Sequence, residues 1–232
     1  PHKRKSKEES YMELSQAMKN RHSVRAYTDR AIEGKVKDNL LSFIQTCNEE
    51  SGLHMQLILN EPKAFAGRMA RYGKFSGVKN YIALIGKKDD SLDEKCGYYG
   101  EKVVLYAQSL GLNTCWVGLT YSKEKTAFQV GEGEKLRLVI AVGYGSTQGA
   151  AHKSKDRDKV MKASSSAPRW FIKGVDAALL APTAMNQQKF IFSLDGDTVS
   201  ATAGKGFYSK VDLGIANYHF EIGAGRKEFR WS

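Results

Sequence analysis

The stretch LLAPTAMNQQKFIFSL, residues 179–194, decides how this chain is organised. Its apolar start predicts the end of a helix, Pro182 ends that helix, and the run from Phe190 predicts a strand. An earlier stretch, IQTCNEESGLHMQLIL at residues 44–59, aligns with it without a gap as helix end, loop and strand. The shared order of elements predicts that an α+β unit occurs twice in the chain.

The alignment continues beyond these two stretches. YIALIG at 81–86 corresponds to VSATAG at 199–204, and a helix expected at 100–111 matches one at 214–225 with the same glycine spacing. The additional residues of the first half fall at 60–80. Two unrelated segments with a common element order are the alternative interpretation. A true duplication would let one chain build a site where its halves meet, as a two-fold dimer does.

Hydrophobic periodicity predicts helices and strands in alternation along the whole chain. We expect a first unit at 1–145, a basic linker at 146–168 and a shorter second unit at 169–232. The expected helices are 8–20, 35–50, 97–110, 170–180 and 211–222, and the expected strands are 53–59, 81–86, 114–118, 136–143, 190–194, 198–203 and 228–231.

Composition limits the possible partners and locations. The 232 residues carry 36 Lys and Arg against 25 Asp and Glu, a net charge of +11, which indicates an anionic partner: nucleic acid, a membrane surface or a phosphorylated small molecule. No apolar run has the length of a membrane span, and residues 1–10 do not resemble a secretory signal. Cys47, Cys96 and Cys115 are far apart, so we expect no metal site, no disulfide framework and a cytoplasmic protein.

Two polar motifs carry candidate binding chemistry. RHSVR at 21–25 places two guanidiniums, an imidazole and a hydroxyl within five residues, a set that can surround a phosphate. A basic helix end that complements the helix dipole is the alternative. APTAMNQQ at 181–188 offers neutral donors and acceptors that suit the amide edge of a heterocycle, or else forms an ordinary loop.

Two further segments end predicted strands with glycine. GLNTCWVG at 111–118 brings backbone N–H groups within reach of a flat ligand, and we expect Trp116 to belong to the core. GYG at 143–145 precedes KSK at 153–155, which alone is a solvated lysine run. No GxGxxG opens a βαβ unit, and GxxxxGK[ST], GxSxG and HExxH are missing, which argues against dinucleotide-fold dehydrogenases, P-loop enzymes and hydrolases.

Taken together, RHSVRAY (21–27), APTAMNQQKF (181–190), GLNTCWVG and VGYG followed by KSK resemble the FMN-dependent nitroreductase family, from about residue 11 onward. In most of that family a PS-x-x-N-x-Q loop comes early and reaches the FMN of the dimer partner. Here the loop comes late, and TCNEES at 46–51 has lost it. The chain thus resembles a subgroup with two fused half-units. The implied fold is α+β: two related subdomains packed as a pseudo-dimer around a central mixed or antiparallel sheet.

The resemblance implies an FMN site. The FMN phosphate and ribityl end would be held by Arg21, Ser23 and Arg25, with His22 in support, and by the basic pair Lys153 and Lys155. One flavin face and the ribityl side would be covered by Pro182, Thr183, Ala184, Asn186 and Gln188.

The remaining implied contacts are to the flavin ring. Gly118 and Leu119 would offer backbone N–H groups near its reactive nitrogen. Lys74 would meet the pyrimidine carbonyl edge, although Arg71 stands where the family pattern has Asn. No side chain is expected to act as general base, because the flavin performs the chemistry.

The implied activity is a ping-pong oxidoreductase in which NAD(P)H is the reductant. A nitroaromatic, quinone or similar electron-poor molecule would be the acceptor. We expect no specific nucleic-acid or membrane partner, and a monomer (as a pseudo-dimer) or a weak homodimer. A flavin-binding protein without turnover and a basic nucleic-acid-binding protein are the alternatives from other classes. Reductive dehalogenation and flavin breakdown are alternatives among enzymes.

Overall fold

The apolar runs of the first half form a four-stranded antiparallel sheet in the order β1-β2-β4-β3. The computed structural model describes residues 7–163 and 166–232. The strands are β1 (Gln56–Ile58), β2 (Tyr81–Lys87), β4 (Glu134–Gly143) and β3 (Asn113–Val117). Residues 81–86 of β2 are all buried, which explains why this strand is a continuous apolar run and does not alternate.

A second, separate sheet contains the strands of the second half in the order β5-β6-β7-β8. Its strands are β5 (Met161–Lys162), β6 (Phe190–Asp195), β7 (Thr198–Ala203) and β8 (Arg230–Trp231). Only the central pair is antiparallel, and both edge strands pair in parallel. The α+β class is therefore confirmed, whereas the one central sheet that was expected is divided into two.

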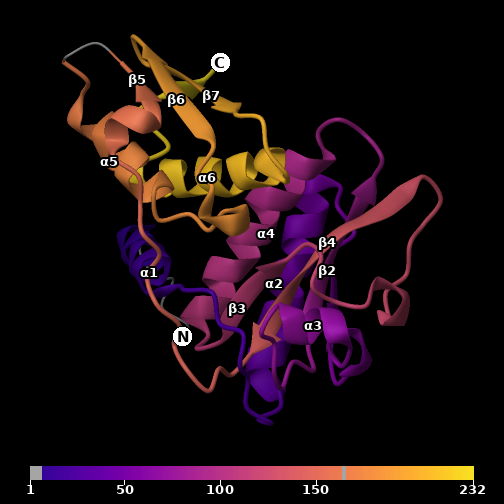
Figure 1. Cartoon of the computed structure of the whole chain (residues 1–232). Coiled ribbons are helices and arrows are strands. Elements are labelled where there is room, and N and C mark those ends of the chain that lie inside the picture. Colours follow the sequence, from indigo (N-terminus) through magenta and orange to yellow (C-terminus); the bar gives the residue numbers. More distant parts are fainter. Residues whose placement is uncertain (1–6, 164–165) are drawn as a thin grey trace.

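Helices occupy the space between the two sheets. α4 (Leu92–Ser109) packs against α6 (Ser209–Ala224), and α5 (Arg169–Ala178) packs on the other side of α6 (Figure 1). Most residues of α6 are buried, because neighbours surround it. The other helical segments are α1 (Lys7–Asn20), α2 (Gly34–Ser51), α3 (Arg68–Tyr72), and the short turns η1 (Lys63–Phe65), η2 (Lys123–Lys125), η3 (Arg157–Lys159) and η4 (Ala184–Asn186).

Two glycines allow α4 and α6 to touch backbone to backbone. A Cβ atom on Gly97 would lie 2.0 Å from the carbonyl oxygen of Val211, and one on Gly214 would lie 2.1 Å from that of Glu94. Only glycine permits this approach. The contact is reciprocal, because Val211 and Gly214 each come 117 positions after Glu94 and Gly97 (94 to 211, 97 to 214).

The predicted elements agree closely with the observed ones, with local differences. α4 begins at Leu92 rather than at 97, and β1 is shorter than the predicted strand. The segment 60–80 contains η1 and α3. Residues 161–162, within the expected linker, pair with β6. The unit boundaries remain a prediction. Over the described ranges, no helix combines the length and apolarity needed to cross a membrane.

Candidate functional site

Two adjoining hollows lie where the first and second halves meet, and we call them the outer and inner chambers of the first cleft. The outer chamber has a volume of about 400 Å³ and the inner chamber about 130 Å³. Both are lined by Ser23, Arg25, Pro182, Thr183 and Met185. The outer chamber adds Arg21, Ala150, His152 and Asn186, and the inner chamber adds Trp116, Val117, Gly118, Leu138, Ala184, Tyr208, Val211, Asp212 and Ile215.

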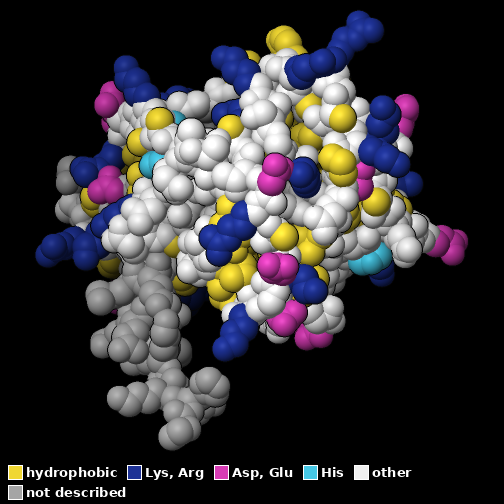
Figure 2. All heavy atoms as spheres, turned by 90° about the horizontal axis from the view of Figure 1, so that it is seen from below, with side chains coloured by type: hydrophobic (Ala, Val, Ile, Leu, Met, Phe, Trp, Pro, Cys, Tyr) yellow, Lys and Arg dark blue, Asp and Glu magenta, His cyan; other side chains and the backbone are white. Residues whose placement is uncertain are grey.

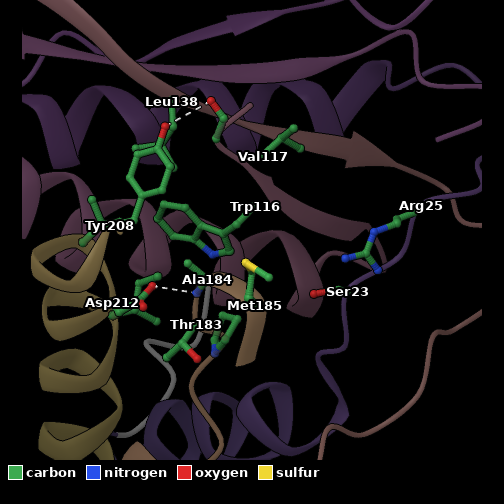
Figure 3. Close-up of a pocket in the computed structure, with 14 residues that line it drawn as sticks. Ser23, Arg25, Trp116, Val117, Leu138, Thr183, Ala184, Met185, Tyr208 and Asp212 are labelled. Atoms are coloured by element: carbon green, nitrogen blue, oxygen red, sulfur yellow. Dashed lines mark hydrogen bonds between the residues drawn. The ribbon is translucent and has the colours of Figure 1, made fainter. Parts of the chain in front are cut away.

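An extended segment after α1 carries the basic motif to the cleft. The backbone N–H of Val24 donates to the carbonyl of Thr114 at 3.0 Å, so the segment runs beside β3. Successive side chains of an extended segment point to opposite sides. Val24 is buried, whereas Ser23 and Arg25 line the cleft (Figure 3). This alternation explains why a five-residue motif can supply both core and site.

Arg21 is the most unusual charged group in the cleft. Its side chain is only 3% exposed, and neither Nε nor Nη1 has a hydrogen-bond partner. The nearest carboxylate oxygen belongs to Glu101, 3.9 Å from Nε. Desolvation by burial lowers the pKa of Arg21. A buried guanidinium with free N–H groups fits an anionic ligand that brings acceptor oxygens, as a phosphate does.

Glu101 connects this arginine to the wall of the inner chamber. It is fully buried on α4, accepts a hydrogen bond from Trp116 Nε1 at 3.0 Å, and lies 2.8 Å from His219 Nε2. These contacts fix the Trp116 ring, which is half-buried and lines the chamber. Trp116 packs against the core, as predicted, and in addition lines the inner chamber.

The loop after α5 is held in place by Asp212 of α6. The carboxylate of Asp212 accepts from the backbone N–H of Ala184 at 2.9 Å (Figure 3). It also accepts from Gln187 Nε2 at 2.7 Å. Burial raises the pKa of Asp212 to about 6. The loop contains left-handed residues, including Met185, whose side chain is 99% exposed. The loop thus presents Met185 to solvent while its backbone is anchored.

Gln188 supports this loop from behind. Its side chain is buried, with Oε1 accepting from the backbone N–H of Lys155 at 2.8 Å and Nε2 donating to the carbonyl of Lys153 at 3.0 Å. The Lys155 ammonium donates to the carbonyls of Gln187 and Gln188. These residues tie the loop to the segment 153–155.

Tyr208 closes the inner chamber. Its hydroxyl donates to the carbonyl of Gly118 at 3.1 Å (Figure 3), and a Cβ on Gly118 would lie 2.4 Å from the Tyr208 ring. The guanidinium of Arg137 lies over the same ring, 4.3 Å from its centroid. The backbone φ of Tyr208 is +58°, a conformation that non-glycine residues rarely adopt.

The structure brings eight of the predicted site residues together in the first cleft: Arg21, Ser23, Arg25, Gly118, Pro182, Thr183, Ala184 and Asn186. Six others line neither chamber: His22, Lys74, Leu119, Lys153, Lys155 and Gln188. Lys74 lies just past α3 with a φ of +61°, and Leu119 is 58% exposed.

Sequence reasoning missed the contribution of α6. Tyr208, Val211, Asp212 and Ile215 are spaced by three, one and three residues, which puts them on one helix face. This spacing was the available signal, but it also fits an ordinary buried helix face. His152 and Met185 were missed too.

The surface and the cysteines add little to the site. On the face shown in Figure 2, Lys and Arg side chains are scattered among acidic and uncharged ones and form no single patch. Cys47, Cys96 and Cys115 are buried and free. Among the side chains that the structure describes, in residues 14–163 and 166–232, no three His, Cys, Asp or Glu are grouped as metal ligands would be.

Residues 13–224 match the family model described as "Putative TM nitroreductase". The chain belongs to this nitroreductase family. The matched range includes the RHSVR segment, the loop of residues 182–188 and all of α6. No curated protein is significantly similar to the chain.

Solved structures share the nitroreductase fold. A Thermotoga maritima protein described as a "putative nitroreductase" is 24% identical, with 92% of this chain and 84% of that chain covered and a TM-score of 0.66. A nitroreductase family protein from Streptococcus pneumoniae is 14% identical, with coverages of 64% and 98% and a TM-score of 0.53. A nitroreductase from Desulfovibrio desulfuricans, solved in complex with FMN, is 19% identical, with coverages of 62% and 93% and a TM-score of 0.49.

Proposed function

We propose that this nitroreductase family member is an FMN-dependent NAD(P)H oxidoreductase. It reduces nitroaromatic, quinone or similar electron-poor acceptors by ping-pong hydride transfer. The observation that carries the proposal is Arg21, a residue that lines a chamber of about 400 Å³ and whose buried guanidinium has no hydrogen-bond partner at Nε or Nη1. A buried charge without a full set of partners is costly, and an anionic cofactor would repay that cost.

The two chambers would hold different parts of the proposed cofactor. Arg21, Ser23 and Arg25 would bind the phosphate and ribityl end in the outer chamber. Trp116 and Leu138 give the inner chamber apolar surface suited to a flat ring. His22, Lys153 and Lys155 remain proposed contributors near the phosphate, and the hydrogen bonds of Lys155 also support the loop.

The chain's own residues position and tune the cofactor. When bound, FMN supplies hydride transfer between the nicotinamide and the acceptor. The backbone N–H groups of Gly118 and Leu119 would face its reactive nitrogen, and Lys74 would meet the pyrimidine edge. Tyr208, at the inner end of the cleft, would exclude water and limit the size of the acceptor. No side chain is assigned as general base.

The test is a spectrum followed by a turnover assay on the full chain. Protein titrated with FMN should become yellow and retain the flavin through gel filtration. It should then oxidise NADH or NADPH in the presence of a quinone or a nitroaromatic. Failure to retain FMN refutes the proposal. Retention without oxidation of either nucleotide would identify a flavin-binding protein without turnover.

A matched pair of arginine variants makes the binding test specific. Arg25 lines both chambers, whereas Arg157 is exposed and pairs with Asp176 on the surface. Arg25→Ala should weaken FMN binding, and Arg157→Ala should not. Equal effects would show that general positive charge, rather than the cleft, attracts the anion.

We further propose that a monomer is sufficient to hold FMN, because both sides of the first cleft come from one chain. A weak homodimer is compatible with this proposal provided that flavin does not depend on it. Sedimentation velocity monitored at a flavin wavelength should show the cofactor moving with the monomer. Flavin found only with a dimer would contradict the assignment.

A further inference from the structure

A further cleft, of about 420 Å³, lies at the other end of the α4–α6 contact and is lined by residues of both halves. We call it the second cleft. We propose that it is the pseudo-symmetric counterpart of the first cleft and binds a protonated aromatic amine. The inference goes beyond the proposed function, because it rests on the geometry of the two clefts and not on what the first one binds.

The residues that α4 and α6 contribute to the two clefts occupy equivalent positions on the two helices. In the first cleft α6 contributes Tyr208 of its N-cap, Val211, Asp212 and Ile215. In the second cleft α4 contributes the residues that stand 117 positions earlier at each point, namely Ser91, Glu94, Lys95 and Tyr98. This is the same offset that relates Gly97 to Gly214 in the reciprocal contact. Exchanging the two helices therefore exchanges these four pairs of lining residues, as a two-fold axis does.

The segments that follow the two helices also resemble each other, with an offset of 114 for the glycines (111 to 225) and 115 for the tryptophans (116 to 231). Gly111 and Gly225 both have positive φ, +82° and +86°, just after α4 and α6. A tryptophan follows each of them and lines a cleft. Trp116 donates to Glu101 of the preceding helix, α4, at 3.0 Å. Trp231 likewise donates to Glu221 of the preceding helix, α6, at 2.7 Å.

The chemistry of the second cleft differs from that of the first. Arg21 and Arg25 have no arginine counterpart among its lining residues, all of which are described, and Lys95 is its single basic residue. A phosphorylated cofactor therefore has no anion cradle here. Two carboxylates, Glu94 and Glu221, line the cleft instead, although Arg226 also pairs with Glu221 at 3.2 Å.

Aromatic rings and an unpartnered acceptor complete the cleft. Tyr98, Tyr99 and Trp231 provide ring surface, and the Tyr98 hydroxyl donates to Glu221 at 2.6 Å. Asn217 is only 9% exposed; its Nδ2 donates to Glu94 at 3.0 Å, while its Oδ1 has no partner. Carboxylates and an amide carbonyl oxygen accept hydrogen bonds, and both aromatic faces and carboxylates attract cations. An aromatic ring bearing an ammonium group supplies both the N–H donors and the positive charge.

Three probes with one ring and different head groups test this assignment on the full chain. They are 2-phenylethylamine, which is cationic, 2-phenylethanol, which is neutral, and 3-phenylpropionate, which is anionic. The indole N–H signals of Trp231 and Trp116 in NMR spectra report on the second and first clefts, respectively. The amine should shift Trp231 selectively and bind about tenfold more tightly than the alcohol, and the carboxylate should bind least.

Glu94 is exposed, so Glu94→Gln should fold normally. The variant should lose about fivefold in amine affinity and leave alcohol binding unchanged. Glu124→Gln, at an exposed site on η2, is the matched control and should change neither affinity.

Four outcomes overturn the proposal: no shift of Trp231 with the amine, equal affinity for amine and carboxylate, no effect of Glu94→Gln, or a second FMN bound per chain. Loss of FMN binding with an intact Trp231 response refutes only the proposed function. The reverse result refutes only the second site.

Discussion

Asp212 and Ala184 join the two elements that shape the first cleft, because the buried carboxylate of α6 accepts the backbone N–H of the loop at 2.9 Å. The loop has several left-handed residues and needs such an anchor to keep one conformation. The same carboxylate lines the inner chamber, so the protonation state of Asp212 and the shape of the cleft are linked.

The stability of the fold should depend on pH through Asp212. Its pKa is raised from the ordinary value of 3.8 to about 6, mainly by burial, so the charged form is less favourable in the folded than in the unfolded state. Stability from this group is therefore fully present below its unfolded pKa and is lost as the pH rises through about 6. With urea denaturation as the measurement, the free energy of unfolding of Asp212→Asn should fall less than that of the wild type as the pH rises. The difference should be about 1.4 kcal/mol for each unit by which the pKa of Asp212 is raised.

The control for this measurement is Asp38→Asn, at an exposed position of α2. Its free energy of unfolding should follow the wild-type pH profile. Parallel profiles for the wild type and Asp212→Asn would contradict the assignment of the raised pKa to Asp212.

Arg21→Ala should weaken FMN far more than riboflavin, which lacks the phosphate. Because charge-assisted hydrogen bonds to the phosphate would be lost, the affinity for FMN should fall about 10- to 100-fold. Fluorescence titrations with both flavins give the ratio directly, and a thermal melt identifies any loss of folded protein. Equal weakening of both flavins would show that Arg21 does not contact the phosphate.

Glu101→Gln should cost far more stability than Glu50→Gln. Glu101 is fully buried among Arg21, Trp116 and His219, so its replacement leaves a buried positive charge uncompensated, at a cost of about 3–5 kcal/mol. Glu50 pairs with Lys102 at the surface, where a pair contributes at most about 1 kcal/mol. Chemical denaturation compares the two variants, and similar costs would argue against a buried charge network.

Gly97→Ala and Gly214→Ala should each destabilise the chain by a comparable amount, because each added Cβ would meet a carbonyl of the opposite helix. Forcing the helices apart should cost at least about 1–3 kcal/mol. Lys95→Ala, on the same helix as Gly97 but without such a contact, is the control. If one variant lost much stability and the other none, the two glycines would not contribute equally to the contact between α4 and α6.

Tyr208→Ala should enlarge the inner chamber and favour bulky acceptors. The Tyr208 ring fills space beside Gly118, and the chamber beneath it has a volume of only about 130 Å³. The KM for a bulky quinone should fall relative to that for a small one, and the nicotinamide KM serves as reference. An unchanged ratio of the two quinone KM values would mean that Tyr208 does not limit acceptor size.

Much of the fold was readable because strands and helices here have strong apolar patterns, as β2 and α2 show. The position of Ser23 and Arg25 at one site was also predictable, since their chemistry is local to one motif; their binding of FMN stays a prediction. The hydrogen bonds of Gln188 to the backbone of Lys153 and Lys155 were not predictable, because an amide that binds backbone has the same sequence signature as one that binds a ligand. The helix register was predicted to pair Gly100 with Gly214, whereas the structure relates Gly97 to Gly214 through a tertiary contact.

The crossing of Gly97 and Gly214 joins two helices of a single polypeptide. In an assembly of separate subunits, such a crossing would weaken on dilution, but here it is independent of protein concentration. Because the two helices belong to one chain, the residues at the two ends of the crossing can also differ from each other. A mutation in a homodimer appears at both symmetric sites, whereas a mutation in this chain appears at one, so each cleft can acquire its own ligand without altering the other.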